Sequence, residues 1–216
     1  LAWRTGSRDI ANASVAVQGL GNVGRHLALR LTDMGARIVA VCNSRHGVVN
    51  DQGLDIAKLL DKLDRSPRAD LASLVQGEAC TPDELLGLDV DILIPAAVEN
   101  VITSTNADSV RATMIVEAAS LPVSLEADAM LRERGVTVVP DLLVNAGGVT
   151  VSYFEWAQNA ARGRWTRERA LSRLVDRLDQ AWQAVLNQAK GDHSCLREAA
   201  YDVAVARVSE AVALRG

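Results

Sequence analysis

Three glycines with the spacing G-x-G-x-x-G point most directly to chemistry in this sequence. Gly19, Gly21 and Gly24 follow a short apolar run at residues 15–17 and precede residues with the period of a helix. In a strand–turn–helix unit, the first glycine permits the turn, the second lets a pyrophosphate lie against bare backbone, and the third lets helix and strand pack closely. Dinucleotide binding is therefore the favoured interpretation. The alternative is a packing turn in a sheet without a ligand.

The pyrophosphate would lie on the first turn of the following helix, at Asn22 and Val23, where backbone N–H groups have no partner within the helix. A second candidate segment follows the predicted strand at residues 37–42. NAD-preferring sites place Asp or Glu there to accept a hydrogen bond from the ribose 2′-hydroxyl, whereas this chain has Asn43. An amide does not repel a 2′-phosphate, and Ser44 and Arg45 are able to donate to one. A polar turn with a solvated arginine is the alternative.

Two further segments carry small residues where a ligand has room. Ala96 and Ala97 follow an apolar strand, at the edge where ligands lie over the backbone, although small residues there also suit close packing. Downstream, Asn145 precedes the pair Gly147 and Gly148. We expect this pair to reflect a close approach, and the Asn145 amide to pair with a carboxamide.

The elements that must position these residues alternate along the chain. Apolar runs predict strands at 15–17, 37–42, 90–94, 113–117 and 136–139. Helical periodicity predicts helices from 22 to Gly35, from about 54 to 63, from Ser124 to Gly135, from 145 to 156, from 166 to 190 and from 194 to 214. The first of these should carry Val23, Leu27, Leu31 and Met34 on one face. We also expect Asn106 to cap a short helix.

This alternation predicts an α/β fold, a Rossmann-like, doubly wound and mostly parallel sheet with a carboxyl-terminal helical appendage. We divide the chain into a linker at 1–13 that ends a missing upstream domain, a dinucleotide-binding domain at 14–160, and a helical tail at 161–216 that packs on it.

Composition restricts the class of protein. The chain has 216 residues, 49% of them hydrophobic, and a net charge of −4, with Lys and Arg scattered. We expect a globular cytoplasmic protein with neither nucleic acid nor membrane as partner. Three cysteines without ligand spacing suggest no disulfide framework and no metal site. Because Leu1 is not preceded by Met, we expect more protein upstream.

The sequence resembles the carboxyl-terminal, nucleotide-binding domain of the glutamate dehydrogenases within the glutamate/leucine/phenylalanine/valine dehydrogenase family. The resemblance covers residues 15–216. It rests on VQGLGNVG at 17–24, DILIPAAVEN at 91–100, PD at 140–141 with NAGGV at 145–149, and SYFEWAQN at 152–159. The last two motifs favour the glutamate branch over the leucine or phenylalanine branch.

The resemblance implies oxidative deamination of L-glutamate to 2-oxoglutarate and ammonia, with hydride passing to NAD or NADP, in a cleft between two domains of a homohexamer. By matching motifs, it assigns the dinucleotide to Gly19, Gly21, Asn22, Val23, Gly24, Asn43, Ser44, Arg45, Ala96, Ala97, Ser120 and Asn145. It assigns Ser152 to the side-chain carboxylate of the substrate and places Val149 beside the substrate. A Ser152 hydroxyl that bonds back to a helix carbonyl is the structural alternative.

Two departures from the family pattern matter. The catalytic lysines and aspartate of the family lie in its amino-terminal domain, so the resemblance implies that this chain holds no catalytic residue and is inactive alone. In addition, EAASLPV at 117–123 stands where the family has E-G-A-N followed by P-T. Ser120 removes an amide that would face the nicotinamide ribose, and Leu121 adds bulk. This second departure supports an alternative function, a non-catalytic regulatory subunit that senses nucleotide or amino acid.

Overall fold

The computed structural model describes residues 9–192 and 195–214, which form two compact units divided between Val138 and Val139. We call residues 9–138 the sheet unit and residues 139–214 the helical unit. The division falls before the predicted boundary at residue 160, because α8 (Ala146–Ala160) packs on α9 (Arg167–Asp192). Of the predicted linker 1–13, residues 1–8 lie outside the described residues.

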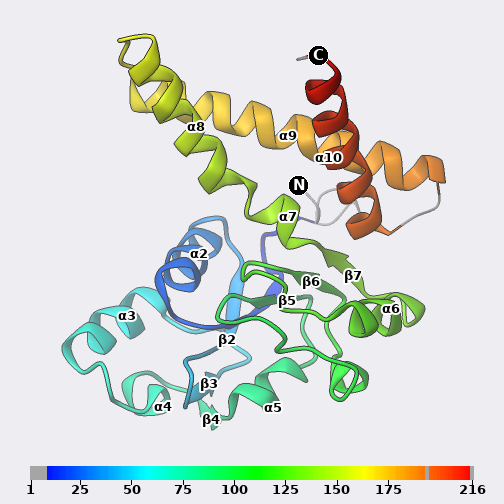
Figure 1. Cartoon of the computed structure of the whole chain (residues 1–216). Helices are drawn as coiled ribbons and strands as arrows, with labels where there is room; N and C mark the ends of the chain where they lie inside the picture. The colour runs from blue at the N-terminus through cyan, green and yellow to red at the C-terminus, as the bar shows by residue number, and fades with distance from the viewer. Residues whose placement is uncertain (1–8, 193–194, 215–216) are drawn as a thin grey trace. The chain divides into compact units, whose positions relative to one another are not determined.

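The sheet has seven strands in the order β4-β3-β2-β1-β5-β6-β7 (Figure 1). They are β1 (Ser14–Gln18), β2 (Arg37–Cys42), β3 (Gly47–Val49), β4 (Glu78–Cys80), β5 (Ile92–Pro95), β6 (Met114–Val116) and β7 (Thr137–Val139). Strand β1 runs parallel to β2 and β5, and β5 parallel to β6, whereas β3 is antiparallel to both its neighbours. The predicted Rossmann-like, mostly parallel sheet is confirmed.

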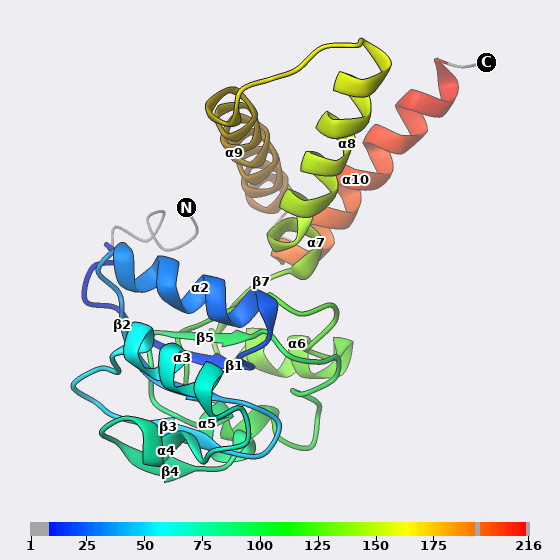
Figure 2. The same ribbon diagram turned by 90° about the vertical axis from the view of Figure 1, so that its left-hand side faces the viewer.

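Helices cover both faces of the sheet (Figure 2). In the sheet unit they are α2 (Asn22–Asp33), α3 (Ile56–Arg65), α4 (Leu71–Leu74), α5 (Pro82–Leu86), α6 (Leu125–Glu133) and the 3-10 turn η1 (Ala107–Ser109). Side chains alternate along a strand, so Ala16 of β1 faces a core with Leu85 of α5 and Leu131 of α6. The neighbouring residues Val15 and Val17 face the other side, where α2 contacts β1 and β2 and packs on α3.

The predicted apolar face of α2 is not the face that the structure buries most deeply. Gly24 and Ala28 are buried, whereas Val23 is 53% exposed and Met34 is 59% exposed. The small residues face the sheet because Gly24 lies against the carbonyl of Gly19, which leaves no room for a larger side chain on that face.

Several short elements were not predicted, namely β3, α4, β4 and α5. Strand β3 has only three residues, Gly47–Val49, and polar residues flank it on both sides, so no apolar run marks it in the sequence. Helix α5 begins with a capping box, in which Thr81 and Glu84 each bond to the other's backbone N–H. This S/T-x-x-E spacing was a readable signal in the sequence.

The two predicted helix caps differ in outcome. Ser124 accepts a hydrogen bond from the N–H of Ala127 and caps α6 as predicted. Asn106 precedes η1, but its side chain does not cap it. Instead its amide accepts from the N–H of Thr103 and donates to the carbonyl of Val101, so it closes the loop before the turn.

The helical unit consists of α7 (Asp141–Val144), α8, α9 and α10 (Leu196–Ala213). Its small core contains Val185, Ala199 and Ala200. The predicted helices at 145–156, 166–190 and 194–214 are confirmed apart from their exact ends. Within the described ranges, no helix is both long and apolar enough to cross a membrane.

Candidate dinucleotide site

The glycine turn after β1 has the geometry that its spacing predicts. Gly19 has a φ of +107°, a left-handed conformation that favours glycine, and a Cβ there would lie 2.8 Å from the Cβ of Ala97. A Cβ on Gly24 would lie 1.9 Å from the carbonyl oxygen of Gly19. Both glycines are therefore required by the packing of the protein itself.

Gly21 differs from the other two glycines, because a Cβ built on it meets no atom within 4 Å. It is the N-cap of α2, and no side chain caps this helix end. The first turn carries no acidic residue, and Asn22 and Val23 are exposed. Uncapped N–H groups at the positive end of a helix dipole, beside open space, are a fitting place for a pyrophosphate.

The turn after β2 is closed by Asn43. Its side-chain oxygen accepts hydrogen bonds from the N–H groups of Arg45, at 2.8 Å, and His46, at 2.9 Å. Its own N–H donates to the carbonyl of His46. The oxygen is thus committed to the turn, and the amide NH₂ is the part that remains for a ligand. Ser44 and Arg45 are exposed beside it, so the turn presents donors rather than acceptors.

The sheet brings this turn, the glycine turn and the end of β5 to one edge. The N–H of Ala96 donates to the carbonyl of Gln18, at 2.7 Å, and Gly19 donates to the carbonyl of Cys42, at 2.9 Å. Ala96 is buried and Ala97 is exposed. This edge is formed by the carboxyl ends of parallel strands, where α/β folds bind their ligands.

The segment after β6 also reaches this edge. The N–H groups of Ala118 and Ala119 donate to the carbonyl of Pro95, at 3.0 and 2.9 Å, and Ser120 is exposed. Leu121 has a φ of +46°, which is a strained conformation for a bulky residue, and its side chain is 47% exposed. The departure from the family pattern therefore coincides with backbone strain at the candidate site.

The other predicted site residues, Asn145, Val149 and Ser152, belong to the helical unit. Asn145 joins α7 to α8 and is exposed. Val149 is 70% exposed, and Ser152 is exposed three residues further along α8. Within the described residues the Ser152 hydroxyl makes no hydrogen bond, whereas that of Thr150 donates to the carbonyl of Ala146 at 2.7 Å. The back-bonding considered for Ser152 is thus made by Thr150 instead.

The Gly147–Gly148 pair lies in the first turn of α8. A Cβ built on either glycine meets no described atom within 4 Å. No described atom therefore lies close to either glycine, and the expected close approach is not found within the described residues. Like Gly21, the pair leaves open space beside a helix start.

Two features of the sheet edge were not predicted. Gln18, the last residue of β1, is 8% exposed, and its Oε1 has no hydrogen-bond partner among the described atoms. A polar residue at the end of an apolar strand, directly before the glycine turn, was the signal that the sequence offered for Gln18.

The second feature is a pair of cysteines, Cys42 and Cys80, that flank Gly47. A Cβ on Gly47 would lie 3.1 Å from the Cβ of Cys42 and 2.6 Å from the Sγ of Cys80.

Burial raises the pKa of both thiols to about 11. Nearby acidic side chains add to the shift, Asp83 for Cys42 and Glu84 for Cys80, whereas a hydrogen bond from the N–H of Gly19 partly offsets it for Cys42. Both groups therefore stay protonated near neutral pH, and a neutral thiol is a poor nucleophile and a poor metal ligand. We therefore interpret Cys42 and Cys80 as packing residues that support the turn closed by Asn43.

Comparison with known proteins gives a consistent result. The family model that matches residues 2–216 is described as Glutamate/Leucine/Phenylalanine/Valine dehydrogenase. The cryptic catabolic NAD-specific glutamate dehydrogenase of Bacillus subtilis is 41% identical over 208 residues, which are 96% of this chain and 48% of that protein. The NADP-specific glutamate dehydrogenase of Saccharolobus shibatae is 41% identical over 209 residues, 96% of this chain and 49% of that protein.

Among solved structures, the hetero-hexameric glutamate dehydrogenase of Thermus thermophilus in its leucine-bound form superposes with a TM-score of 0.91. The two are 34% identical, and the match covers 100% of this chain and 50% of that one. The chain thus spans about half the length of the relatives it matches.

Proposed function

The chain belongs to the glutamate/leucine/phenylalanine/valine dehydrogenase family, and we propose that it is the NAD(P)-binding domain of a glutamate dehydrogenase. The main support for this proposal is the glycine turn. Gly19 and Gly24 are fixed by packing, whereas Gly21 leaves open space at an uncapped helix end. A turn kept for packing alone has no need of that space. The whole protein would convert L-glutamate to 2-oxoglutarate and ammonia.

In this proposal the residues of the chain hold and orient the two reactants. The N–H groups of Gly21, Asn22 and Val23 bind the pyrophosphate, the Asn43–Arg45 turn binds the adenosine ribose, and Ala96, Ala97 and Ser120 line the inner face of the dinucleotide. Asn145 holds the nicotinamide carboxamide, and Ser152, with Val149 beside it, donates to the side-chain carboxylate of glutamate. Bound NAD or NADP supplies the hydride acceptor.

None of these residues is suited to move a proton near neutral pH, since they offer backbone amides, small side chains, amides, hydroxyls and one guanidinium. We therefore propose that the proton-transferring groups lie in the half of the protein that the relatives have beyond this chain. The 216-residue chain alone should bind dinucleotide and fail to oxidise glutamate.

The Asn43 turn supports acceptance of NADP. With its oxygen bonded to two N–H groups, Asn43 offers a ligand only its NH₂, and Arg45 adds a cation. A 2′-phosphate needs donors, whereas the 2′-hydroxyl of NAD is usually held by an acceptor. We propose NADP as at least an equal cofactor.

For the whole protein we further propose a cytoplasmic homohexamer. Support for a six-subunit assembly comes from the hetero-hexameric Thermus thermophilus relative. Because that assembly contains more than one kind of subunit, it also favours the second candidate function, a non-catalytic subunit that assembles with an active relative and senses nucleotide or amino acid. The strained Leu121 in the departing segment after β6 is the observation on this chain that favours it.

Two glycine substitutions test the proposed cofactor site. Gly21→Ala should fold with an unchanged melting temperature, because its Cβ meets no protein atom. It should weaken NADPH and NADH by about tenfold or more, because the Cβ would enter the space of the pyrophosphate and move this charged group away from its N–H donors. Binding is measured by the fluorescence of the reduced nicotinamide. Gly163→Ala is the matched control, since its Cβ also meets nothing and Gly163 lies outside the candidate site.

Unchanged affinity in Gly21→Ala would contradict the site. The two candidate functions are separated by assaying the full-length protein alone and together with an active relative. Glutamate oxidation by the protein alone supports the enzyme, and activity only in the mixed assembly supports the regulatory subunit.

A further inference from the structure

A pocket in the helical unit takes no part in the function proposed above. It is formed by α7, α9, α10 and the first residue of α8, and has a volume of about 150 Å³. Leu142 and Leu143 line it from α7, Val185 from α9 and Val203 from α10. All of these residues lie within one compact unit, so the pocket is a property of that unit alone.

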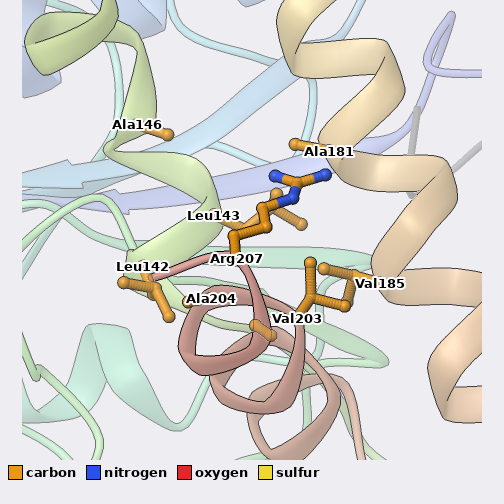
Figure 3. Close-up of a pocket in the computed structure, with 9 residues that line it drawn as sticks. Leu142, Leu143, Ala146, Ala181, Val185, Val203, Ala204 and Arg207 are labelled. Carbon is orange, nitrogen blue, oxygen red and sulfur yellow. The ribbon is translucent and has the colours of Figure 1, made fainter. Parts of the chain in front are cut away.

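The pocket combines aliphatic walls with a single charge. No aromatic ring and no carboxylate are among the described residues that line it, and Arg207 of α10 is the one charged member. Figure 3 shows the Arg207 side chain extending along the pocket towards Ala181 of α9, so that the guanidinium lies at one end. Arg207 is exposed, and no ion pair or hydrogen bond joins it to another described residue.

We propose that this pocket binds a short, branched aliphatic monocarboxylate, with the hydrocarbon chain between α7, α9 and α10 and the carboxylate on Arg207. The size supports a small ligand, since a cavity of about 150 Å³ with similar walls takes up one benzene-sized molecule. The guanidinium supports a carboxylate, whose two oxygens match its paired donors.

The same features exclude neighbouring classes of ligand. A dicarboxylate such as glutamate or 2-oxoglutarate would bury its second charge among leucine and valine side chains without a partner, which is costly. An amino acid would bring an ammonium group, and the described lining offers no carboxylate to pair with it. The proposed ligand class is therefore distinct from the proposed substrate. The test of this pocket is also independent of whether the protein has glutamate dehydrogenase activity.

The test uses the whole 216-residue chain with methyl-labelled Leu and Val and sodium 4-methylpentanoate as the probe, followed by methyl NMR. We expect saturable shifts of the Leu143, Val185 and Val203 methyl groups. Arg207→Gln should weaken binding about fivefold, the upper range for an exposed ion pair. Arg177→Gln removes an exposed arginine of α9 that lies outside this pocket and is the matched control, with unchanged affinity.

Two further arms decide the outcome. The neutral isostere 4-methylpentanamide should bind as weakly to the wild type as 4-methylpentanoate binds to Arg207→Gln. Ala181→Leu should block the pocket while Arg207 remains, and its circular dichroism checks that it is folded. Equal binding of acid and amide, or shifts confined to methyl groups elsewhere, would overturn the proposal. Displacement of the probe by leucine at equal concentration would overturn the exclusion of amino acids.

Discussion

The sheet unit and the helical unit differ in how they bury apolar side chains. In the sheet unit Leu93, Ile115 and Leu131 are at most 1% exposed and belong to one extended core. The helical unit has a small core, and its helices leave apolar residues exposed at the spacing of one helix face. These are Val149, Tyr153 and Trp156 on α8, Leu171 and Val175 on α9, and Tyr201, Val205, Val208 and Val212 on α10. The comparison teaches that the sheet unit is stabilised by its own core. The helical unit buries less apolar surface and should therefore have a lower free energy of unfolding.

The candidate site residues follow the same division. In the sheet unit they are fixed by backbone hydrogen bonds and glycine packing, as at Gly19, Gly24 and Asn43. In the helical unit Asn145 is exposed between α7 and α8, and Ser152 is exposed on α8. The proposed cofactor residues of the sheet unit are therefore held more rigidly than the proposed substrate residue Ser152.

The largest expected effect concerns the two cores. Leu131→Ala removes a fully buried side chain and should lower the free energy of unfolding of the sheet unit by about 2–5 kcal/mol. Leu171→Ala, at a position that is 49% exposed, should change the stability of the helical unit by no more than about 0.5 kcal/mol. Urea unfolding measures both.

The units are followed separately, because Trp156, Trp165 and Trp182 are the tryptophans among the described residues and all belong to the helical unit. In a Trp3→Phe background, fluorescence reports the helical unit, and the methyl NMR signals of the buried Leu93 and Ile115 report the sheet unit. We expect the fluorescence transition at lower urea. A single coincident transition, shifted equally by both leucine variants, would contradict the comparison.

The second prediction concerns alkaline pH. Burial raises the pKa of the Cys42 thiol from its ordinary value of 9.0 to about 11, so between these values the unfolded thiol is ionised while the folded one keeps its proton. The folded state then binds more protons, and stability falls as pH rises, by up to about 3 kcal/mol from this group. Cys42→Ala should remove that part of the slope for the sheet unit and leave the fluorescence transition unchanged. An unaltered slope would show that the thiol does not titrate as the structure indicates.

The sequence predicted most of the parallel sheet because β1, β2, β5 and β6 are buried, continuously apolar runs. It missed β3 and β4, since these three-residue strands lie among polar residues and form no apolar run that stands out. The glycine motif predicted the tight turn after β1, because Gly19 and Gly24 each lie where the packing leaves no room for a Cβ. On α2 the close contact at Gly24 places small residues against the sheet, and helical periodicity alone does not show this.

The polar details of the site were beyond sequence reasoning. Asn43 was predicted to lie beside the ribose, but the commitment of its oxygen to the N–H groups of Arg45 and His46 depends on the turn that it closes. The strain at Leu121 likewise depends on backbone angles that no residue pattern specifies.

The third prediction tests the cofactor turn. Arg45→Ala should weaken NADPH roughly tenfold to a hundredfold through loss of a charge-assisted bond and leave NADH unchanged. Asn43→Asp keeps an oxygen for the two N–H groups but adds a negative charge, so it should also weaken NADPH while NADH retains its affinity. Arg65→Ala, an exposed arginine of α3 paired with Asp61, is the control. Equal losses for both dinucleotides would show that the turn does not read the phosphate.

The smallest expected effect lies in the helical unit and concerns Ser152 in the full-length protein. Its hydroxyl is exposed and makes no hydrogen bond within the described chain, so it is available to donate to a substrate. A hydrogen bond to a charged carboxylate contributes about 1.5–3 kcal/mol, and the exposure of Ser152 favours the lower value. Ser152→Ala should therefore lower kcat/KM for glutamate about tenfold.

Norvaline provides the discriminating substrate, because it has the chain of glutamate without the distal carboxylate and should lose little in Ser152→Ala. Thr150→Val is the matched control on the same helix, since it removes a hydroxyl that is already bonded to the carbonyl of Ala146 and should leave both substrates and cofactor affinity unchanged. If glutamate and norvaline suffer equally, the hydroxyl supports the helix rather than the substrate. In that case Ser152 would contribute to packing alone, and recognition of the glutamate side chain would belong to other residues of the protein.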